Sequence, residues 1–365
     1  MDTNDSLKCM IAYNNCAKHD SEYNISEPDF NHGCWKSFVD LCWPTDETPS
    51  LDGTGTTLSL IIPLILIASL SIGTNTLVCV VFYLYSQLRL IRHYFVINLA
   101  VVDVVIAAVL IPLFVASQLA RENIILCRSQ IVLDIACGTA SILCLVMISL
   151  ERYVAVKYSL HYHSIVTQRK AIFGMVFIWT YSAIVSCTAF LSLVKNSNSG
   201  KKLPQCFFLS RGYVTFITIA SFVAPVCVMT FAYWNMFIVA RSHARRIDSQ
   251  STQSDPERSG HSKRRLKREL KGAKTLTIIM GTHFLCWCPL FVFYLVYTYS
   301  FSPLQVTKTF TVVNYVILFL RYCNSLFNPL IYSGINRQFR AGIKRFLLRR
   351  NEGIEELQTT AATRA

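Results

Sequence analysis

Seven long apolar segments with almost no charge constrain this chain more than any other feature. Each is long enough for a helix to cross a hydrocarbon layer of about 30 Å. With 53% hydrophobic and 15% charged residues, the sequence has too little polar surface for a soluble protein of 365 residues. We therefore predict an all-α membrane protein, a bundle of seven transmembrane helices. The spans are expected at residues 57–85, 94–119, 125–157, 171–194, 210–240, 271–300 and 307–333.

The distribution of charge predicts the orientation of the bundle. Residues 1–56 contain ten acidic residues and three lysines, whereas residues 241–274 contain eleven Lys or Arg and four acidic residues. Basic connections between spans mark the cytoplasmic side. We therefore expect an extracellular N-terminus and a multi-pass protein of the plasma membrane. Because the net charge of +14 is segregated in this way, no nucleic-acid partner is expected.

Three regions follow from these spans. Residues 1–56 form an extracellular segment, residues 57–333 the transmembrane domain, and residues 334–365 the cytoplasmic tail. The tail should begin with a short amphipathic helix within 336–349, because four apolar residues fall on one helical face with cations around it. Those four residues are Phe339, Ile343, Phe346 and Leu347.

The cytoplasmic loop 241–270 is expected between the fifth and sixth spans. Its part 247–262 is polar and rich in helix breakers, so we predict a flexible segment there. The basic stretch 263–271 would suit anionic lipid headgroups, which makes membrane lipids an expected partner.

The N-terminal segment has the marks of an oxidising, extracellular environment. It contains two glycosylation sequons, at Asn4 and Asn24, together with four cysteines. Four cysteines allow three pairings, and the sequence does not choose among them. The cysteines are Cys9, Cys16, Cys34 and Cys42.

Polar side chains inside three of the spans should meet in the bundle. In hydrocarbon such groups must satisfy one another or hold water. Asp103 is the most demanding, because a lone buried carboxylate needs a cation or a proton. A simple hydrogen-bonded connection between helices is the alternative. The cluster consists of Asn75, Asp103, Asn324, Ser325 and Asn328.

A family resemblance rests on a set of motifs that occur in order, each in the appropriate span. Over residues 57–350 the chain resembles a rhodopsin-like (class A) G-protein-coupled receptor. The motifs are Gly73-Thr-Asn75, Asn98-Leu-Ala-Val-Val-Asp103, Cys127, Glu151-Arg-Tyr153, Trp179, Pro225, Tyr233, Cys286-Trp-Cys-Pro289 and Asn328-Pro-Leu-Ile-Tyr332.

The resemblance implies an activation switch at the cytoplasmic side. Arg152 of the third span would pair with Glu269 at the base of the sixth, and its release would let the sixth span swing out and admit a heterotrimeric G protein. Tyr233 and Tyr332 would stabilise the open form. Glu151, Asn328 and Pro329 belong to the motifs of this switch. A solvated charge is the alternative for Glu269.

The resemblance also implies a disulfide between Cys127 and Cys206 and a sodium ion at Asp103 in the resting state, with no other cofactor. Arrestin and receptor kinases are implied as further partners. No catalytic site is expected, because the spans contain no nucleophile–base pair and no set of metal ligands.

Asp134 is the residue most informative about the ligand. It precedes Arg152 by 18 residues, or five helical turns and about 27 Å, which places it in the outer part of the membrane. An acid at this position resembles the biogenic-amine receptor branch, in which the carboxylate pairs with the ammonium of a small-molecule agonist. A polar contact to a neighbouring helix is the alternative. The other candidate ligand residues are Thr218, Ser221, Trp287, Phe291, Tyr294 and Tyr322.

Arg321 departs from the amine-receptor pattern, which has Gly at this place. It is expected to pair with Asp134 or Asp103, or to face lipid headgroups. If it neutralises Asp134, a carboxylate-bearing or uncharged ligand becomes plausible. The alternative function is therefore a class A receptor for a peptide, a lipid or another small non-amine ligand.

Overall fold

The computed structural model describes residues 11, 15, 54–120, 123–158, 161–197, 210–250, 256–299, 308–335, 339–346 and 348. It also describes the side chains of most of these residues. All regular secondary structure in them is helical, which confirms the all-α prediction. The long helices are α3 (Thr54–Leu84), α4 (Tyr94–Val105), α5 (Ile111–Leu119), α6 (Ile124–Lys157), α8 (Gln168–Ser197), α9 (Arg211–Thr218), α10 (Ala224–Gln250), α11 (Pro256–Tyr299) and α12 (Lys308–Ile335).

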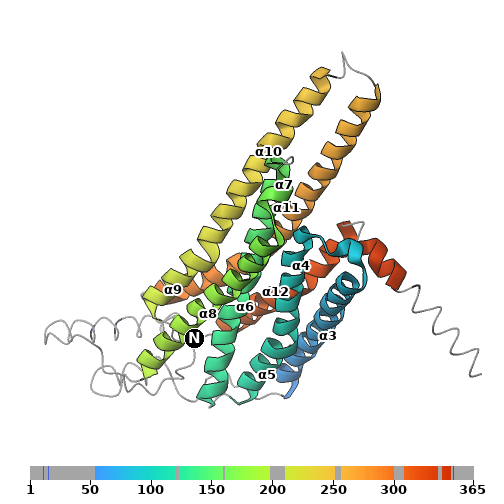
Figure 1. Ribbon diagram of the computed structural model, residues 1–365. Coiled ribbons are helices and arrows are strands. Elements are labelled where there is room, and N and C mark those ends of the chain that lie inside the picture. The colour runs from blue at the N-terminus through green and yellow to red at the C-terminus, as the bar shows by residue number, and fades with distance from the viewer. Residues whose placement is uncertain are drawn as a thin grey trace, which may run out of the picture.

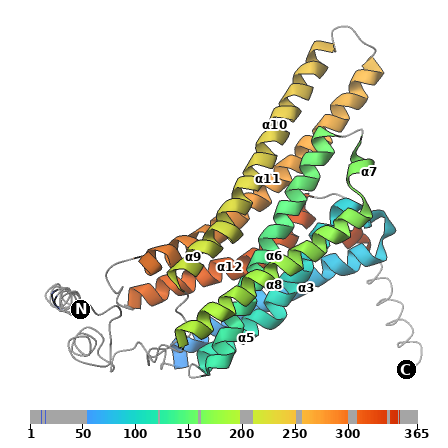
Figure 2. The same ribbon diagram turned by 60° about the vertical axis from the view of Figure 1, so that its left-hand side comes forward.

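The helices pack side by side as an elongated bundle (Figure 1). Helix α6 is central, since it contacts α4, α8, α10 and α11, and α12 packs against α3 and α11. The paired helices α10 and α11 extend well beyond the rest of the bundle in both views (Figures 1 and 2). The short helix α7 (Tyr162–Ile165) lies between α6 and α8 in the chain.

Six helical stretches are long and apolar enough to cross a membrane. They are Leu60–Leu84, Tyr94–Leu119, Ile124–Lys157, Gln168–Ser192, Arg211–Val239 and Thr277–Tyr299, and each coincides with a predicted span. Helix α12 covers the predicted seventh span, but its described part is more polar. Arg321, Asn324 and Asn328 lower its hydropathy, and all three are buried between helices.

Two spans contain π-helical turns. One is η4 (Ile106–Leu110), before α5, and the other is η5 (Ile219–Val223), before α10. Each lies next to a proline, Pro112 or Pro225, at the second position of the following helix. Proline lacks a backbone N–H and clashes with the carbonyl four residues earlier, so a wider turn relieves the crowding. The sequence identified the prolines but not these turns.

The prediction of a flexible loop over residues 247–262 was largely wrong. Helix α10 continues to Gln250, and α11 begins at Pro256 and runs for 44 residues. The expected start of the sixth span, residue 271, therefore lies inside α11. Residues 263–271 consist entirely of Arg, Lys, Glu and Leu, which have high helix propensity, so a helix formed there extends back into the predicted loop. Proline is also favoured at the first turn of a helix, where its missing N–H costs nothing.

Residues 339–346 form a further helix that packs against the bundle. Phe339 is fully buried, and its ring centroid lies 5.1 Å from that of His93. A Cβ added to Gly342 would meet Cγ1 of Val81 at 2.7 Å, so the two segments are in close contact. The predicted apolar face is thus turned towards other helices, although Leu347 lies outside the described residues.

Several predicted features fall outside the described residues. They are the sequons at Asn4 and Asn24, the four cysteines of residues 1–56, and Cys206. Cys127 is disulfide-bonded. Its pairing with Cys206 stays a prediction.

Candidate functional site

An ion pair between two helices lies at the centre of the candidate ligand site. Nη1 of Arg321, on α12, donates to Oδ1 of Asp134, on α6. The side chain of Arg321 is 3% exposed and that of Asp134 is 18% exposed. Of the partners that the sequence left open for Arg321, the structure brings it to Asp134.

Aromatic rings enclose this ion pair. The Arg321 guanidinium carbon lies 4.6 Å from the ring centroid of Tyr322 and 5.6 Å from that of Trp287. Such distances allow cation–π attraction. Tyr322 is buried and packs edge to face on Phe114, at 5.8 Å. The hydrogen bond to Asp134 comes from the guanidinium of Arg321, and the neighbouring Tyr322 ring packs against that guanidinium.

The predicted aromatic residues of α11 form a continuous stack. Trp287 stacks on Phe291 at 6.3 Å between ring centroids, and Phe291 stacks on Phe222 of η5 at 4.6 Å. Trp287 also stacks on His283, at 5.5 Å. Tyr294 is half-buried and close enough to Asp134 and Arg321 to interact with both charges. These rings line one side of the region around the ion pair.

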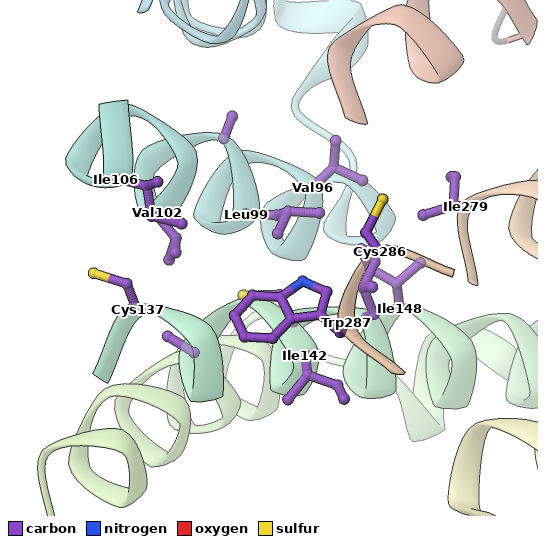
Figure 3. Close-up of a cluster of buried hydrophobic side chains, with 14 of the residues drawn as sticks. Val96, Leu99, Val102, Ile106, Cys137, Ile142, Ile148, Ile279, Cys286 and Trp287 are labelled. Atoms are coloured by element: carbon purple, nitrogen blue, oxygen red, sulfur yellow. The ribbon is translucent and has the colours of Figure 1, made fainter. Parts of the chain in front are cut away.

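Trp287 is wedged between helices at the base of this region. Figure 3 shows its ring among buried side chains of α4 and α6, which include Leu99, Val102 and Ile142. On α6 it contacts Gly138, where an added Cβ would lie 2.5 Å from Cη2 of the indole. Gly138 was not among the predicted site residues. Its position one turn after Asp134 on α6 is the one signal that could have identified it.

The two predicted hydroxyls of the fifth span have different partners. Thr218 donates to its own helix, at the carbonyl of Val214, 2.7 Å away. Ser221 accepts a hydrogen bond from Thr139 of α6 at 3.2 Å. Both side chains are buried. Thr139 is a candidate ligand residue that sequence reasoning missed, since only the fold shows that it meets Ser221.

A narrow cavity connects the ion pair with the predicted polar cluster. Its walls include Asp134 and Arg321 at one end and Asn324 and Ser325 at the other. Other wall residues are Ile106, Leu110, Gly138, Trp287 and Tyr322. The ligand region and the polar cluster are therefore adjacent in the bundle.

The polar cluster itself forms as predicted in its main contacts. Asn328 donates to Oδ2 of Asp103 at 2.9 Å, and Asn75 donates to the backbone carbonyl of Ser325 at 3.0 Å. Two buried oxygens of the cluster, Oδ1 of Asp103 and Oδ1 of Asn324, have no hydrogen-bond partner among the described residues. Oxygen atoms of this kind are the ligands that hard cations prefer, so the donor set fits a sodium ion.

At the other end of α6 the structure tests part of the predicted switch. Arg152 pairs with its neighbour Glu151, at 3.2 Å between Nε and Oε2. Glu151 also accepts a hydrogen bond from Tyr162 of α7 at 2.5 Å. The side chain of Glu269 lies outside the described residues, so the Arg152–Glu269 contact stays a prediction.

The remaining switch residues lie on the helices where the sequence placed them. Tyr233 is half-buried against the hydrophobic core, and Asn328 and Pro329 are buried. The side chain of Tyr332 lies outside the described residues.

Comparison with known proteins agrees with this architecture. Residues 74–332 match the family described as 7 transmembrane receptor (rhodopsin family). The chain is 31% identical over 316 residues to the alpha-1D adrenergic receptor of Sus scrofa. The aligned residues cover 76% of this chain and 54% of that receptor. The chain therefore spans about half the length of this relative. The histamine H2 receptor of Homo sapiens is 29% identical over 334 residues, 86% of this chain and 87% of its own.

A second histamine H2 receptor, from Cavia porcellus, is 31% identical over 301 residues, which are 80% of this chain and 79% of the receptor. The chain belongs to the rhodopsin family of seven-transmembrane receptors. Together with its apolar helices, this membership makes the chain a multi-pass protein of the plasma membrane.

Proposed function

We propose that this receptor binds an extracellular biogenic amine and activates heterotrimeric G proteins. The observation that carries the proposal is the position of Asp134, a carboxylate inside the bundle beside a stack of aromatic rings. An aromatic wall next to a carboxylate suits a small aromatic ammonium ion, through charge pairing and cation–π attraction. The relatives named above are adrenergic and histamine receptors, which supports the same ligand class.

The proposed mechanism is a shift between two conformations. The ligand would reach the site from outside and contact α6, α10, α11 and α12. It activates the receptor to the extent that it binds the form with α11 displaced outward more tightly than the resting form. Pro289 provides a bend in α11, and Trp287 lies less than one turn away, in contact with the site.

Several finer features belong to the same proposal. The N-terminus is extracellular, and the helix at 339–346 lies at the cytoplasmic membrane surface. Cys127 pairs with Cys206 and holds the second extracellular loop over the site. A sodium ion held by the polar cluster, with the unpartnered oxygens of Asp103 and Asn324 among its ligands, would supply the positive charge that the buried carboxylate lacks. Arrestin, receptor kinases and membrane lipids are the further partners.

The test is second-messenger output in cells that express the receptor, against a panel of amines: histamine, adrenaline, octopamine, serotonin and dopamine. We expect one of them to act at micromolar concentration or below. Asp134→Asn should weaken that response at least tenfold, or about 1.4 kcal/mol. Ser129→Ala is the matched control, because Ser129 is exposed on the same helix. No response to any of these amines or to a carboxylated form of one, at normal surface expression, would contradict the proposal.

One observation favours a second candidate. Arg321 already pairs with the Asp134 carboxylate, which a plain amine would need for its ammonium. A ligand with an acidic group is therefore the alternative to a simple monoamine. A peptide or lipid ligand remains the broader form of this alternative.

A further inference from the structure

The free edge of the Arg321 guanidinium is the feature of the site that the proposed function does not use. Nη1 binds Asp134, while Nε and Nη2 have no hydrogen-bond partner among the described residues. These two groups share one edge of the planar guanidinium, and their parallel N–H bonds match the two oxygens of a carboxylate. The side chain is almost fully buried, so this edge is removed from bulk water.

The electrostatic balance of the cavity limits what can bind there. Asp134 and Arg321 are the charged residues among those that line the cavity, and each is the counter-charge of the other. A monoamine that takes Asp134 would deprive Arg321 of its counter-charge. Leaving one partner of a buried ion pair without an opposite charge weakens the binding of such a ligand. A ligand with a carboxylate alone would do the same to Asp134.

A zwitterion avoids both costs. Its ammonium can pair with Asp134 while its carboxylate takes the Nε–Nη2 edge of Arg321, so each of the four charges keeps an opposite neighbour. The two protein charges are in direct contact, which favours a ligand whose own charges are separated by a short spacer. In an α-amino acid that spacer is one carbon.

We propose that the ligand is a zwitterionic amine of the α-amino-acid class, bound through Asp134 and the free edge of Arg321. Its side chain would lie against the aromatic stack of Trp287 and Phe291. This inference rests on the proposed function, since it narrows the amine class to amines that carry a neighbouring carboxylate.

The experiment compares matched ligands that differ by the α-carboxylate alone: tyramine with tyrosine, histamine with histidine, and tryptamine with tryptophan. Cells that express the receptor are assayed for second messenger in buffer free of amino acids. In the wild type, the carboxylated member of the active pair should be at least tenfold more potent than its amine. Arg321→Gly should reverse the order, weakening the amino acid and strengthening the amine at least tenfold.

Two variants separate charge from geometry. Arg321→Lys keeps the positive charge but not the two parallel N–H groups, so the preference for the amino acid should shrink without reversing. Asp134→Asn should weaken both members of the pair. If Arg321→Gly fails to reach the cell surface, the comparison of matched ligands on the wild type still tests whether the receptor prefers the amino acid to the amine.

The outcomes distinguish this inference from the proposed function. A wild type that responds better to an amine than to its amino acid overturns the inference and leaves the amine receptor intact. The same holds if Arg321→Gly keeps the wild-type order of potency. If no member of any pair acts at a receptor present on the surface, both proposals fail.

Discussion

Replacing Gly138 with alanine should destabilise the receptor by crowding Trp287. The added Cβ would lie 2.5 Å from Cη2 and 2.9 Å from Cζ3 of the indole, whereas carbon atoms prefer about 3.5–4.0 Å. The ring must therefore move by roughly 1 Å, which its neighbours oppose. His283 and Phe291 stack with it, and the Arg321 guanidinium lies 5.6 Å from its centroid.

The size of the effect follows from comparable core substitutions. Overpacking of a filled core costs about 1–3 kcal/mol, so the melting temperature of the purified receptor should fall by roughly 2–10 °C. Gly281→Ala is the matched control, because Gly281 lies in α11 with nothing within 4 Å of an added Cβ. That control should be neutral or slightly stabilising, since alanine favours helix more than glycine does.

A second substitution locates the clash. Trp287→Phe removes Cη2 and Cζ3, the two atoms that Gly138→Ala would strike. In the Trp287→Phe background, Gly138→Ala should therefore cost much less than in the wild type. The reasoning is refuted if Gly138→Ala melts at the temperature of Gly281→Ala. It is also refuted if the loss is equally large in both backgrounds.

Three further predictions follow from other contacts. In the wild type, sodium chloride should weaken agonist binding compared with choline chloride, and Asp103→Asn should abolish this difference. An unchanged difference in the variant would contradict the assignment of a sodium ion to Asp103. Tyr162→Phe should lower stability by about 1.5–3 kcal/mol through loss of its bond to Glu151, measured as a melting temperature beside the exposed control Tyr158→Phe. Phe339→Ala should cost about 3–5 kcal/mol and reduce surface expression, whereas exposed Lys344→Ala should change neither.

The positions of the spans were predictable because every helix that crosses the hydrocarbon layer needs a continuous run of mostly apolar residues in the sequence. A run such as Tyr94–Leu119 must be predominantly apolar, wherever its neighbours in space lie. The same argument located Asp103 and Asn328 as groups in need of partners, and the structure joins them at 2.9 Å.

Contacts between distant parts of the chain were not predictable in the same way. Arg321 and Asp134 are 187 residues apart, so three partners for the arginine stayed open until the fold placed α12 beside α6. Thr139 and Gly138 belong to no motif, and their roles depend on Ser221 of η5 and Trp287 of α11, which contact them. The π-helical turns depend likewise on how the backbone accommodates Pro112 and Pro225 locally.

The long extensions of α10 and α11 show a different limit of prediction from sequence. Composition alone favoured a flexible loop over residues 247–262, because five of its sixteen residues are Ser and it contains the helix breakers Pro256 and Gly260. The structure continues both helices into that segment. An existing helix lowers the cost of adding further turns, since nucleation has already taken place.

The measurement that tests the account most directly is a charge exchange at the central ion pair. Asp134→Arg and Arg321→Asp, each alone, would place two like charges together in a buried site, and each should abolish surface expression and signalling. The double variant restores opposite charges, so it should recover surface expression well above either single variant. A double variant no better than the single ones would contradict the claim that these two residues pair inside the bundle.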